Sequence, residues 1–295
     1  KNLSKTFSPG TVNEVRALQG VDFTLAEGGF SAIIGTNGSG KSTVLNAIAG
    51  TFQPDEGRII LDGIDITRWP EFKRAALIGR VFQNPFAGTA AEMSIAENIV
   101  MAMKRGRRRG LGWAVDRNTR EEIGARVRAL KMGLEDRLDN PIGTLSGGQR
   151  QALTLLMATW LRPRILLLDE HTAALDPKSA AKVAELTSEI IARDKLTALM
   201  VTHSMQQAVA MPERIIMMHR GKIVEDYHGE MKRRVRIPDL LETFNRAGVI
   251  TSADVHVAAT IAQIAGETDD MVLLAAALAA RALRAGSVCL ELAAI

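Results

Sequence analysis

Gly35-Thr36-Asn37-Gly38-Ser39-Gly40-Lys41-Ser42 is a run that matches the pattern G-x-x-x-x-G-K-[ST]. The apolar residues 31–35 predict a buried β-strand that ends in glycine, and residues 41–49 predict the helix that follows. A strand that turns through glycines into a helix directs backbone N–H groups and the positive end of the helix toward one point. The run therefore predicts a phosphate-binding loop in an α/β fold.

Each residue type in this loop suits a phosphorylated ligand. The glycines permit positive φ angles and close approach of the backbone. Lys41 would place its charge on the β- and γ-phosphates of a nucleotide, and the Ser42 hydroxyl would bind Mg²⁺. The alternative is a glycine-rich turn that matches by chance, which is about a 1% event at average glycine usage. We therefore interpret the loop as a nucleotide site.

Two acidic residues follow a second apolar run. Ile165 to Leu168 predict a buried strand, and Asp169 and Glu170 come directly after it. Ligands of open α/β sheets bind at the carboxyl ends of the strands, where these acids would emerge. We expect Asp169 to hold Mg²⁺ through water and Glu170 to act as the general base on the attacking water. The alternative is a plain strand end with two solvated acids, and the phosphate loop favours the site.

The rest of the chain alternates between short strands and helices, which indicates an α/β core rich in parallel strands. Residues 89–161 differ because they look helical, and a composition shift near Arg246 begins an Ala-rich helical stretch. We expect one domain at 1–246, with a helical subdomain at about 89–161, and a helical appendage at 247–295. The other expected elements are a strand at 58–61 with a turn at Asp62-Gly63, strands at 197–202 and 215–218, and a helix capped by Asp176 from Pro177 to about Arg193.

Composition excludes several classes of protein. The 295 residues are 46% hydrophobic with a net charge of +4, which argues against general disorder and does not by itself require a nucleic-acid partner. The single cysteine, Cys289, rules out an internal disulfide and a Cys-based zinc site. The longest apolar run, residues 271–280, is too short to span a bilayer, and the start lacks a signal peptide. We expect a soluble protein that needs a partner for any work in a membrane.

Leu145-Ser146-Gly147-Gly148-Gln149 precedes the second strand. This run is similar to the signature of ABC-type ATPases, and together with the two motifs above it makes residues 1 to about 246 resemble that family. The resemblance implies a P-loop NTPase (ABC ATPase) core with a small antiparallel β-subdomain, a helical subdomain and, in this chain, a C-terminal α-helical appendage. From the residues alone, Ser146 can cap a helix that starts with two glycines, which would leave its N–H groups for an anion.

Further residues match family elements in order. Gln83 looks like the Q-loop glutamine, Asp176 like the D-loop aspartate and His203 like the switch histidine that contacts the γ-phosphate. Phe7 looks like the aromatic that stacks on adenine; the alternative is a core phenylalanine. His171 stands where many relatives have Pro, and we expect it to be a neighbour rather than a catalyst.

The resemblance implies a complete set of site residues and two cofactors, ATP and Mg²⁺. The catalytic residues would be Glu170, His203 and Gln83, and the metal ligands Ser42, Gln83 and Asp169. The nucleotide-binding residues would be Phe7, Gly35, Thr36, Asn37, Gly38, Ser39, Gly40, Lys41, Ser42, Thr43, Ser146, Gly147, Gly148, Gln149 and Asp176.

The same resemblance implies partners. In the family two domains pair head to tail, so that each ATP lies between one phosphate loop and the other subunit's signature. We expect a homodimer, or a paired ABC subunit, that is peripheral on the cytoplasmic face of the inner membrane and binds integral permease subunits through residues 84–100. A single cassette without long heptads is typical of transporters, most often importers. Residues 79–86 and 169–176 look like an importer group for amino-acid-like solutes, with an extracytoplasmic solute-binding protein as an indirect partner.

Three features are left open. The alternative function is a non-transport ABC-type switch acting on nucleic acid or ribosomes, although we expect no nucleic-acid partner. Residues 252–295 resemble the N-terminal segment of the exodeoxyribonuclease V alpha subunit without a catalytic motif, or form a helical hairpin on the cassette. The basic residues 104–109 form a solvated loop or contact anionic lipid or a membrane subunit. Because the chain begins with Lys1, we expect a shortened N-terminus and a looser adenine contact at Phe7.

Overall fold

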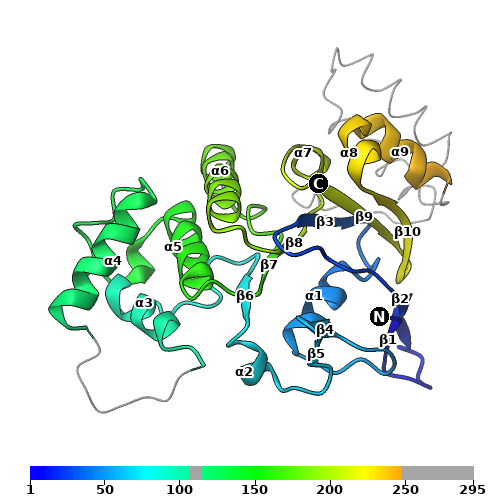
Figure 1. Ribbon diagram of the computed structural model, residues 1–295, viewed down its shortest axis with the longest axis horizontal. Helices are drawn as coiled ribbons and strands as arrows, with labels where there is room; N and C mark the ends of the chain where they lie inside the picture. The colour runs from blue at the N-terminus through cyan, green and yellow to red at the C-terminus, as the bar shows by residue number, and fades with distance from the viewer. Residues whose placement is uncertain (107–114, 247–295) are drawn as a thin grey trace. The chain divides into compact units, whose positions relative to one another are not determined.

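The computed structural model describes residues 1–106 and 115–246 of the chain. The expected helical appendage at 247–295, and residues 107–109 of the basic run, lie outside the described residues. The chain divides into two compact units (Figure 1). The first unit holds Lys1, Phe23–Phe30 and Val44–Met200, and the second holds Asn2–Asp22, Ser31–Thr43 and the chain from Val201 onward.

The second unit holds the phosphate loop and several strands. In the strand order of the main sheet this unit contributes β10 (Lys222–Tyr227), β9 (Arg214–His219) and all but the first residue of β3 (Phe30–Gly35). β3 and β9 are parallel, whereas β9 and β10 are antiparallel. β1 (Leu3–Phe7) and β2 (Val15–Val21) form a separate antiparallel pair. The four central residues of β9 are fully buried, as expected for a strand covered on both faces.

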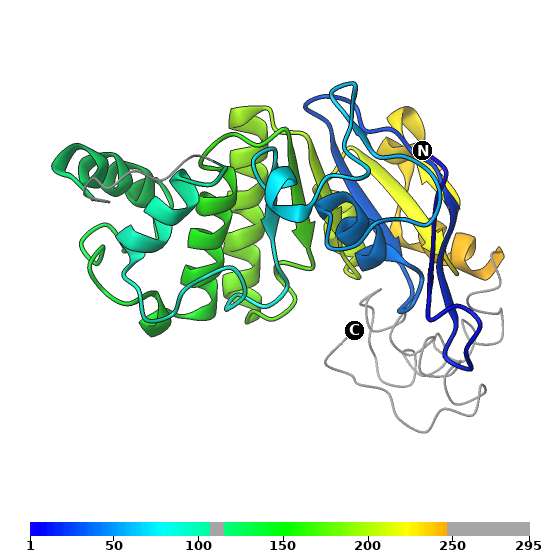
Figure 2. The same cartoon turned by 90° about the horizontal axis from the view of Figure 1, so that it is seen from below.

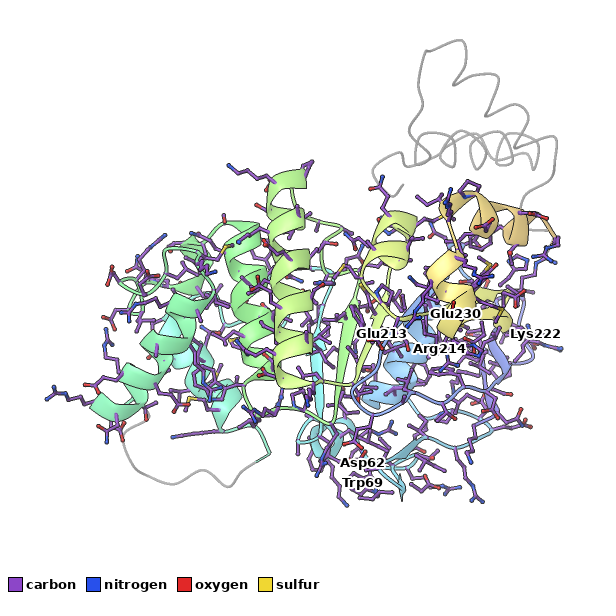
Figure 3. All side chains as sticks on the ribbon, turned by 45° about the horizontal axis from the view of Figure 1, so that its top comes forward. Asp62, Trp69, Glu213, Arg214, Lys222 and Glu230 are labelled. Carbon is purple, nitrogen blue, oxygen red and sulfur yellow. The ribbon has the colours of Figure 1, made fainter. Side chains whose placement is uncertain are left out.

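The helices of the second unit are α7 (Met205–Ala210), which precedes β9, and α8 (Gly229–Arg234) and α9 (Ile237–Arg246), which follow β10. An ion pair closes the β9–β10 ladder, because Arg214 Nε, labelled in Figure 3, donates to Asp226 Oδ1 at 2.8 Å. The Lys232 side chain is buried and its Nζ donates to the carbonyl of Val209 at 2.6 Å. This cation lies near the end of α7, where helix carbonyls favour positive charge.

The first unit contributes all but the last residue of β8 (Ala198–Val201), then β7 (Ile165–Asp169) and β6 (Ile78–Val81), in that order. β6 and β7 are parallel, with Arg80 opposite Leu167. β4 (Ile60–Leu61) and β5 (Ile64–Asp65) form a short hairpin, and the turn residue Asp62 is labelled in Figure 3 with Trp69. We expected a strand at 58–61, but only residues 60 and 61 form one. Ile59 N instead donates to the Thr67 hydroxyl at 2.8 Å.

The helices of the first unit are α2 (Glu71–Arg74), α3 (Ile95–Met103), α4 (Arg117–Ala129), α5 (Gly147–Thr159) and α6 (Pro177–Asp194), with a 3₁₀ turn at Ile142–Thr144. α5 contacts α3, α4, α6 and β6, and Figure 2 shows α5 and α6 side by side. The sequence signals for the start of α6 are confirmed, because Asp176 caps it and Pro177 opens it. The helix ends one residue beyond the expected Arg193, and Lys195 then takes the left-handed conformation, which the sequence did not predict.

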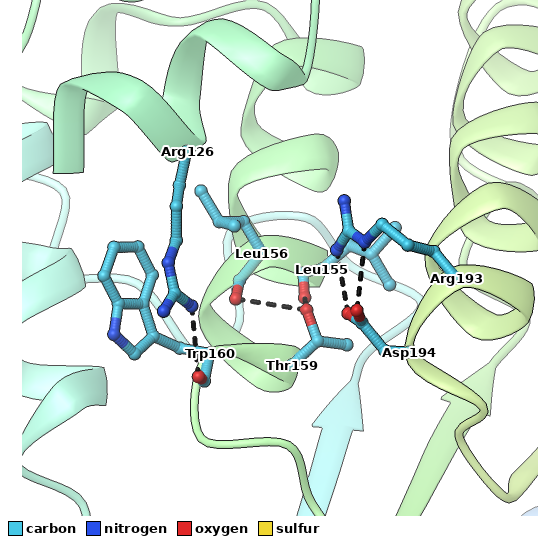
Figure 4. Close-up of polar contacts among 7 residues, drawn as sticks. All are labelled: Arg126, Leu155, Leu156, Thr159, Trp160, Arg193 and Asp194. Carbon is cyan, nitrogen blue, oxygen red and sulfur yellow. Dashed lines mark hydrogen bonds and ion pairs between the residues drawn. The ribbon is translucent and has the colours of Figure 1, made fainter. Parts of the chain in front are cut away.

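The C-terminal end of α5 is fixed by an arginine from α4 and by a hydroxyl of α5 itself (Figure 4). The Arg126 guanidinium lies 4.1 Å from the centre of the Trp160 ring and donates to the Trp160 carbonyl at 3.2 Å. The Thr159 hydroxyl donates to the Leu155 carbonyl at 2.8 Å. A Cβ on Gly79 of β6 would come 2.6 Å from the carbonyl of Ala158, so this strand can pack here only with glycine at that position.

A buried arginine holds the C-terminal end of α1 (Lys41–Ala49), the helix that follows the phosphate loop. Arg74 is fully buried. Its guanidinium donates to four carbonyls: Ala47 at 2.7 Å, Ile48 at 2.9 Å, Trp69 at 2.9 Å and Thr67 at 2.7 Å. A positive charge at the last carbonyls of a helix is favourable and removes their need for water.

No helix among residues 1–106 and 115–246 is long and apolar enough to cross a membrane. The α/β fold class is confirmed, and so are the strands expected at 31–35, 165–168, 197–202 and 215–218, each within two residues. Strands β2, β6 and β10 were not predicted. In β6 the residues Gly79 and Arg80 interrupt the apolar run that marks the neighbouring strand β7.

Candidate nucleotide site

The phosphate loop in the second unit surrounds the ammonium group of Lys41. Lys41 Nζ donates to the carbonyls of Gly35 at 2.8 Å and Thr36 at 3.0 Å, and the residue is only 6% exposed. The loop itself closes through a hydrogen bond from Ser39 N to the Thr36 carbonyl at 3.0 Å. The sequence-predicted turn therefore forms around its own lysine, which places a fixed positive charge in the loop.

Two glycines of the loop have different reasons to be glycine. Gly40 has a φ of +101°, and a Cβ there would lie 2.5 Å from the carbonyl of Ala17 on β2. Gly38 has a φ of +74° with nothing within 4 Å of the Cβ position. Gly40 is thus packed against the protein, whereas Gly38 leaves open space beside the backbone, as a ligand that approaches a loop closely requires.

The first turn of α1 carries the hydroxyl groups expected to meet the ligand. Ser42 is exposed and Thr43 is half-buried, whereas Val44 and Leu45 are fully buried. Asn37 in the loop is exposed as well. The helix therefore buries its apolar face and presents its N-terminal turn outward, where its positive end can bind an anion.

His203 and Phe7 also belong to the second unit. Thr202 N donates to the Ile33 carbonyl at 3.2 Å, and Ser204 N donates to the Thr202 hydroxyl at 3.0 Å, so the backbone on both sides of the half-buried His203 is fixed. Phe7 is 38% exposed at the end of β1, with Lys5 Nζ 5.7 Å from its ring centre. Phe7 is thus not buried in the core, and its contact with adenine stays a prediction.

The two acids lie at the carboxyl end of β7 in the first unit, as their position after the apolar run predicts. Ile165 to Leu168 are buried, and Asp169 and Glu170 are half-buried. Glu170 has a φ of +44°, a left-handed conformation that costs a non-glycine residue about 1–3 kcal/mol. The Glu170 carbonyl accepts a hydrogen bond from Ala173 N at 2.9 Å, which holds this conformation. Such strain is concentrated at functional sites.

Gln83 is exposed, two residues beyond the end of β6. The carbonyl just before it, that of Phe82, accepts a hydrogen bond from Gln151 Nε2 on α5 at 3.0 Å. Gln151 is fully buried. The position of Gln83 is therefore tied to the helix that carries the signature run, which the sequence pattern did not reveal.

The signature run begins α5 as its residue types predict. Ser146 is the N-cap: its hydroxyl accepts from Gln149 N, and Gln149 Oε1 accepts from Ser146 N, each at 3.3 Å. This reciprocal pair is a capping box. Gly147 and Gly148 form the first turn, and a Cβ on Gly148 would lie 2.8 Å from Ser179 on α6. The expectation that Ser146 caps a helix starting with two glycines is confirmed.

Asp176 lies next to this contact. Its carboxylate accepts from Ser179 N at 3.1 Å. Hydrogen bonds from the Ser179 side chain and backbone lower the pKa of Asp176 below its usual range. Ser179 thus touches both the second glycine of the signature and the aspartate that caps α6, so these two segments of the first unit are joined through one residue.

His171 is buried against α6, with 1% of its surface exposed. Its Nε2 lies 3.0 Å from the hydroxyl of Thr187, which donates to the carbonyl of Val183 at 2.7 Å. Because that hydroxyl proton is used, His171 donates from Nε2. Burial lowers the pKa of His171 to about 4, so the ring is neutral at pH 7. The structure agrees with the expectation that His171 is a neighbour.

The structure groups the predicted residues by unit. The phosphate loop, Phe7 and His203 belong to the second unit, and Gln83, Asp169, Glu170, Ser146 to Gln149 and Asp176 belong to the first. Ser42, Gln83 and Asp169 offer a hydroxyl, an amide oxygen and a carboxylate, which are the hard oxygen ligands that Mg²⁺ takes.

Sequence reasoning missed Arg80, whose Nη2 lies 3.3 Å from Asp169 Oδ2. The signal that could have revealed Arg80 is that it is the charged residue of the otherwise apolar strand β6.

Comparison with known proteins finds two families along the chain. A family described as "ABC transporter" matches residues 18–173, and one described as "RecBCD enzyme subunit RecD, N-terminal domain" matches residues 246–295. The chain is 39% identical over 248 residues to a tyrosine transport ATP-binding protein of Clostridioides difficile (strain R20291), covering 84% of this chain and 98% of that protein. It is 33% identical over 228 residues to the putrescine transport ATP-binding protein PotG of Escherichia coli (strain K12), covering 76% of this chain and 55% of that longer protein.

Solved structures give the same result. An ATP-binding cassette determined as a dimer after hydrolysis, bound to ADP and Pi, has a TM-score of 0.65 and 29% identity over 77% of this chain and 96% of that chain. The ADP conformation of another ABC transporter cassette has a TM-score of 0.68 and 28% identity over 83% of this chain and 96% of that chain.

Proposed function

Because this chain belongs to the ABC transporter family and is an ATP-hydrolysing subunit of that family, we propose that it powers the import of an amino-acid-like solute. The names of the two relatives support this proposal, since one is a tyrosine and the other a putrescine transport protein. Both names describe small solutes with an amino group. The permease that carries the solute would bind residues 84–100 at the cytoplasmic face of the inner membrane, and an extracytoplasmic solute-binding protein would act upstream.

The chemistry follows from the arrangement of each unit. The phosphate loop would bind the β- and γ-phosphates through its N–H groups and Lys41, and Phe7 would lie against the adenine. Mg²⁺, held by Ser42, Gln83 and Asp169, would neutralise charge on the phosphates. Glu170 would accept the proton of the attacking water, and His203 would contact the γ-phosphate.

Two copies of the chain would form the working unit. The capped N-terminus of α5 presents the exposed Ser146 with a positive helix end, which suits a phosphate. Each chain already has one phosphate loop, so a second anion-binding helix end is explained by a nucleotide bound to another subunit. The dimeric state of the solved cassette that holds ADP and Pi supports this pairing.

The observation that carries the proposal is the loop that surrounds Lys41 together with the strained Glu170. The test is the rate of ATP hydrolysis by Glu170→Gln and by its matched control, Glu213→Gln. Loss of the general base is expected to lower the rate by about 10²–10⁴-fold, while ATP affinity stays within about threefold. Glu213→Gln should hydrolyse ATP at the parent rate. Unchanged turnover in Glu170→Gln would contradict the assigned role.

The alternative, a switch acting on nucleic acid or ribosomes, is not favoured by the relatives, which are transport proteins. Only the match at residues 246–295 points toward nucleic acid. Co-purification separates the two functions: permease subunits are expected with the full chain, and retention of nucleic acid without permease would contradict the transport assignment.

A further inference from the structure

Arg80 is the charged residue of strand β6, and it contacts the carboxylate that the proposed function assigns to Mg²⁺. Its guanidinium Nη2 lies 2.7 Å from Asn46 Oδ1 and 3.3 Å from Asp169 Oδ2. Its Cζ also lies 4.6 Å from the centre of the Phe82 ring. The side chains of Arg80 and Asp169 are each 15% exposed, so this pair is largely shielded from water. All four residues belong to the first unit.

The sheet register explains how these groups meet. Arg80 on β6 is opposite Leu167 on the parallel strand β7. Side chains two residues apart point to the same face of a strand, and diagonal neighbours on adjacent strands remain within reach of a long side chain. Asp169 is two residues beyond Leu167, so Arg80 reaches it diagonally. Asn46 comes from α1, the helix that begins at the phosphate loop.

We propose that Arg80 is a positioning residue that holds the carboxylate of Asp169 in the orientation needed for Mg²⁺. This inference rests on the proposed role of Asp169. The Arg80 guanidinium links that carboxylate to α1 through Asn46, and to the segment that leads to Gln83 through its contact with Phe82. One side chain thereby sets the relative position of three segments that the nucleotide chemistry uses.

An arginine is suited to this task and a lysine is not. The planar guanidinium offers several N–H groups in a fixed fork and stacks on aromatic rings. Nη2 can therefore donate to Asn46 and to Asp169 while the plane of the guanidinium stacks on the Phe82 ring. A lysine ammonium keeps the charge but cannot hold both oxygens and cover the ring at once.

Charge and orientation predict opposite effects on Mg²⁺. A positive group beside Asp169 repels a divalent cation, so removal of the charge alone would strengthen Mg²⁺ binding. Loss of the orientation weakens it, because partners that orient a metal ligand typically contribute about 10–100-fold in metal affinity. The sign of the change therefore distinguishes positioning from simple charge.

The experiment measures the Mg²⁺ concentration that half-saturates ATP binding, with the full chain carrying Glu170→Gln so that ATP is not consumed. Arg80→Gln and Arg80→Lys are each expected to raise this concentration about tenfold, with ATP affinity in EDTA within about twofold of the parent. The matched control is Arg164→Gln, which removes an exposed arginine paired with Asp62 at 3.4 Å. It should leave the half-saturating Mg²⁺ concentration unchanged.

A thermodynamic cycle completes the test. When Asp169→Asn is already present, Arg80→Gln should change the Mg²⁺ requirement no further, because the two residues act as one unit. Asn46→Ala, which removes the other oxygen bound by Nη2, should raise the requirement in the same direction by about two- to threefold and provides a milder variant should Arg80 variants fold poorly.

Two results would overturn the proposal. One is a lower Mg²⁺ requirement in Arg80→Gln with parent-like behaviour in Arg80→Lys, since charge alone would then explain the pair. The other is an unchanged requirement in both variants. Failure of the proposed function would give a different result. ATP binding by the parent, in which Arg80 is intact, would then not depend on Mg²⁺.

Discussion

Gly40 combines a φ of +101° with a Cβ position 2.5 Å from the carbonyl of Ala17. Gly40→Ala therefore faces both backbone strain and a clash with backbone atoms, and we expect it to lower the free energy of unfolding by at least about 2 kcal/mol. Nucleotide affinity should fall as well, because the loop must shift. Gly38→Ala is the matched control, since its φ is also positive but its Cβ position is open.

The measurements are urea unfolding and titration with ATP. Gly38→Ala should lower the free energy of unfolding by about 1 kcal/mol, the cost of a left-handed alanine without a clash. Equal losses in the two variants would show that contact with Ala17 does not matter to the loop.

His171 makes stability depend on pH. Its pKa falls from the ordinary value of 6.5 to about 4 in the folded protein, because it is buried. The unfolded chain then binds the proton more readily, so stability is fully present above pH 6.5 and is lost as the pH falls toward 4. Between pH 7 and pH 5 this one residue should reduce the free energy of unfolding by about 2 kcal/mol.

Chemical unfolding of the parent and of His171→Gln at several pH values checks this prediction. Glutamine keeps a donor for the Thr187 hydroxyl but carries no proton that titrates. The difference between the two free energies of unfolding should therefore follow pH between 5 and 7. A difference that stays constant with pH would mean that the folded protein accepts the protonated ring.

At the scale of elements, α1 depends on Arg74, which binds the carbonyls of Ala47 and Ile48 at its C-terminal end. Arg74→Met would leave buried carbonyls without donors, each at a cost of about 1–3 kcal/mol, so we expect a loss of at least about 3 kcal/mol in the free energy of unfolding. The control is Arg68→Met, because Arg68 is exposed. Urea unfolding measures both, and similar losses would contradict the capping role of Arg74.

The contrast between α6 and β6 shows what the sequence could predict. The cap at Asp176 and the proline at 177, which the sequence predicted, lie next to each other at the start of a single helix. The same holds for the phosphate loop and for Ser146 at the start of α5, whose signals are local. Arg80 and Arg74 were missed because their partners are distant: Arg80 meets a residue 89 positions away, and Arg74 one 27 positions away. No local pattern records such contacts.

The sequence also predicted the local parts of the candidate site but not its long-range contacts. Residue types at fixed spacing identified the loop, the acids after β7 and the capped signature helix, since each is a short segment with its own physical logic. The tie between Gln151 and the carbonyl before Gln83 spans 69 positions and became visible only in the structure. Local sequence patterns therefore predict the groups that we propose to react better than the groups that hold them.

At the scale of the whole molecule, the proposed function requires two chains. One chain offers a phosphate loop and a separate capped helix end at Ser146, and the proposal assigns these to two different nucleotides. ATP should therefore join two chains, and hydrolysis should separate them. A chain that binds ATP but cannot hydrolyse it should accumulate as a dimer.

The most direct measurement is the molar mass of Glu170→Gln by light scattering on a sizing column, with and without Mg-ATP. Without nucleotide we predict the mass of one chain, 31.9 kDa, and with saturating Mg-ATP twice that mass. Lys41→Ala, added as a control, should abolish the shift because it removes the charge in the phosphate loop. A chain that binds Mg-ATP and still elutes with the mass of one copy would contradict the account.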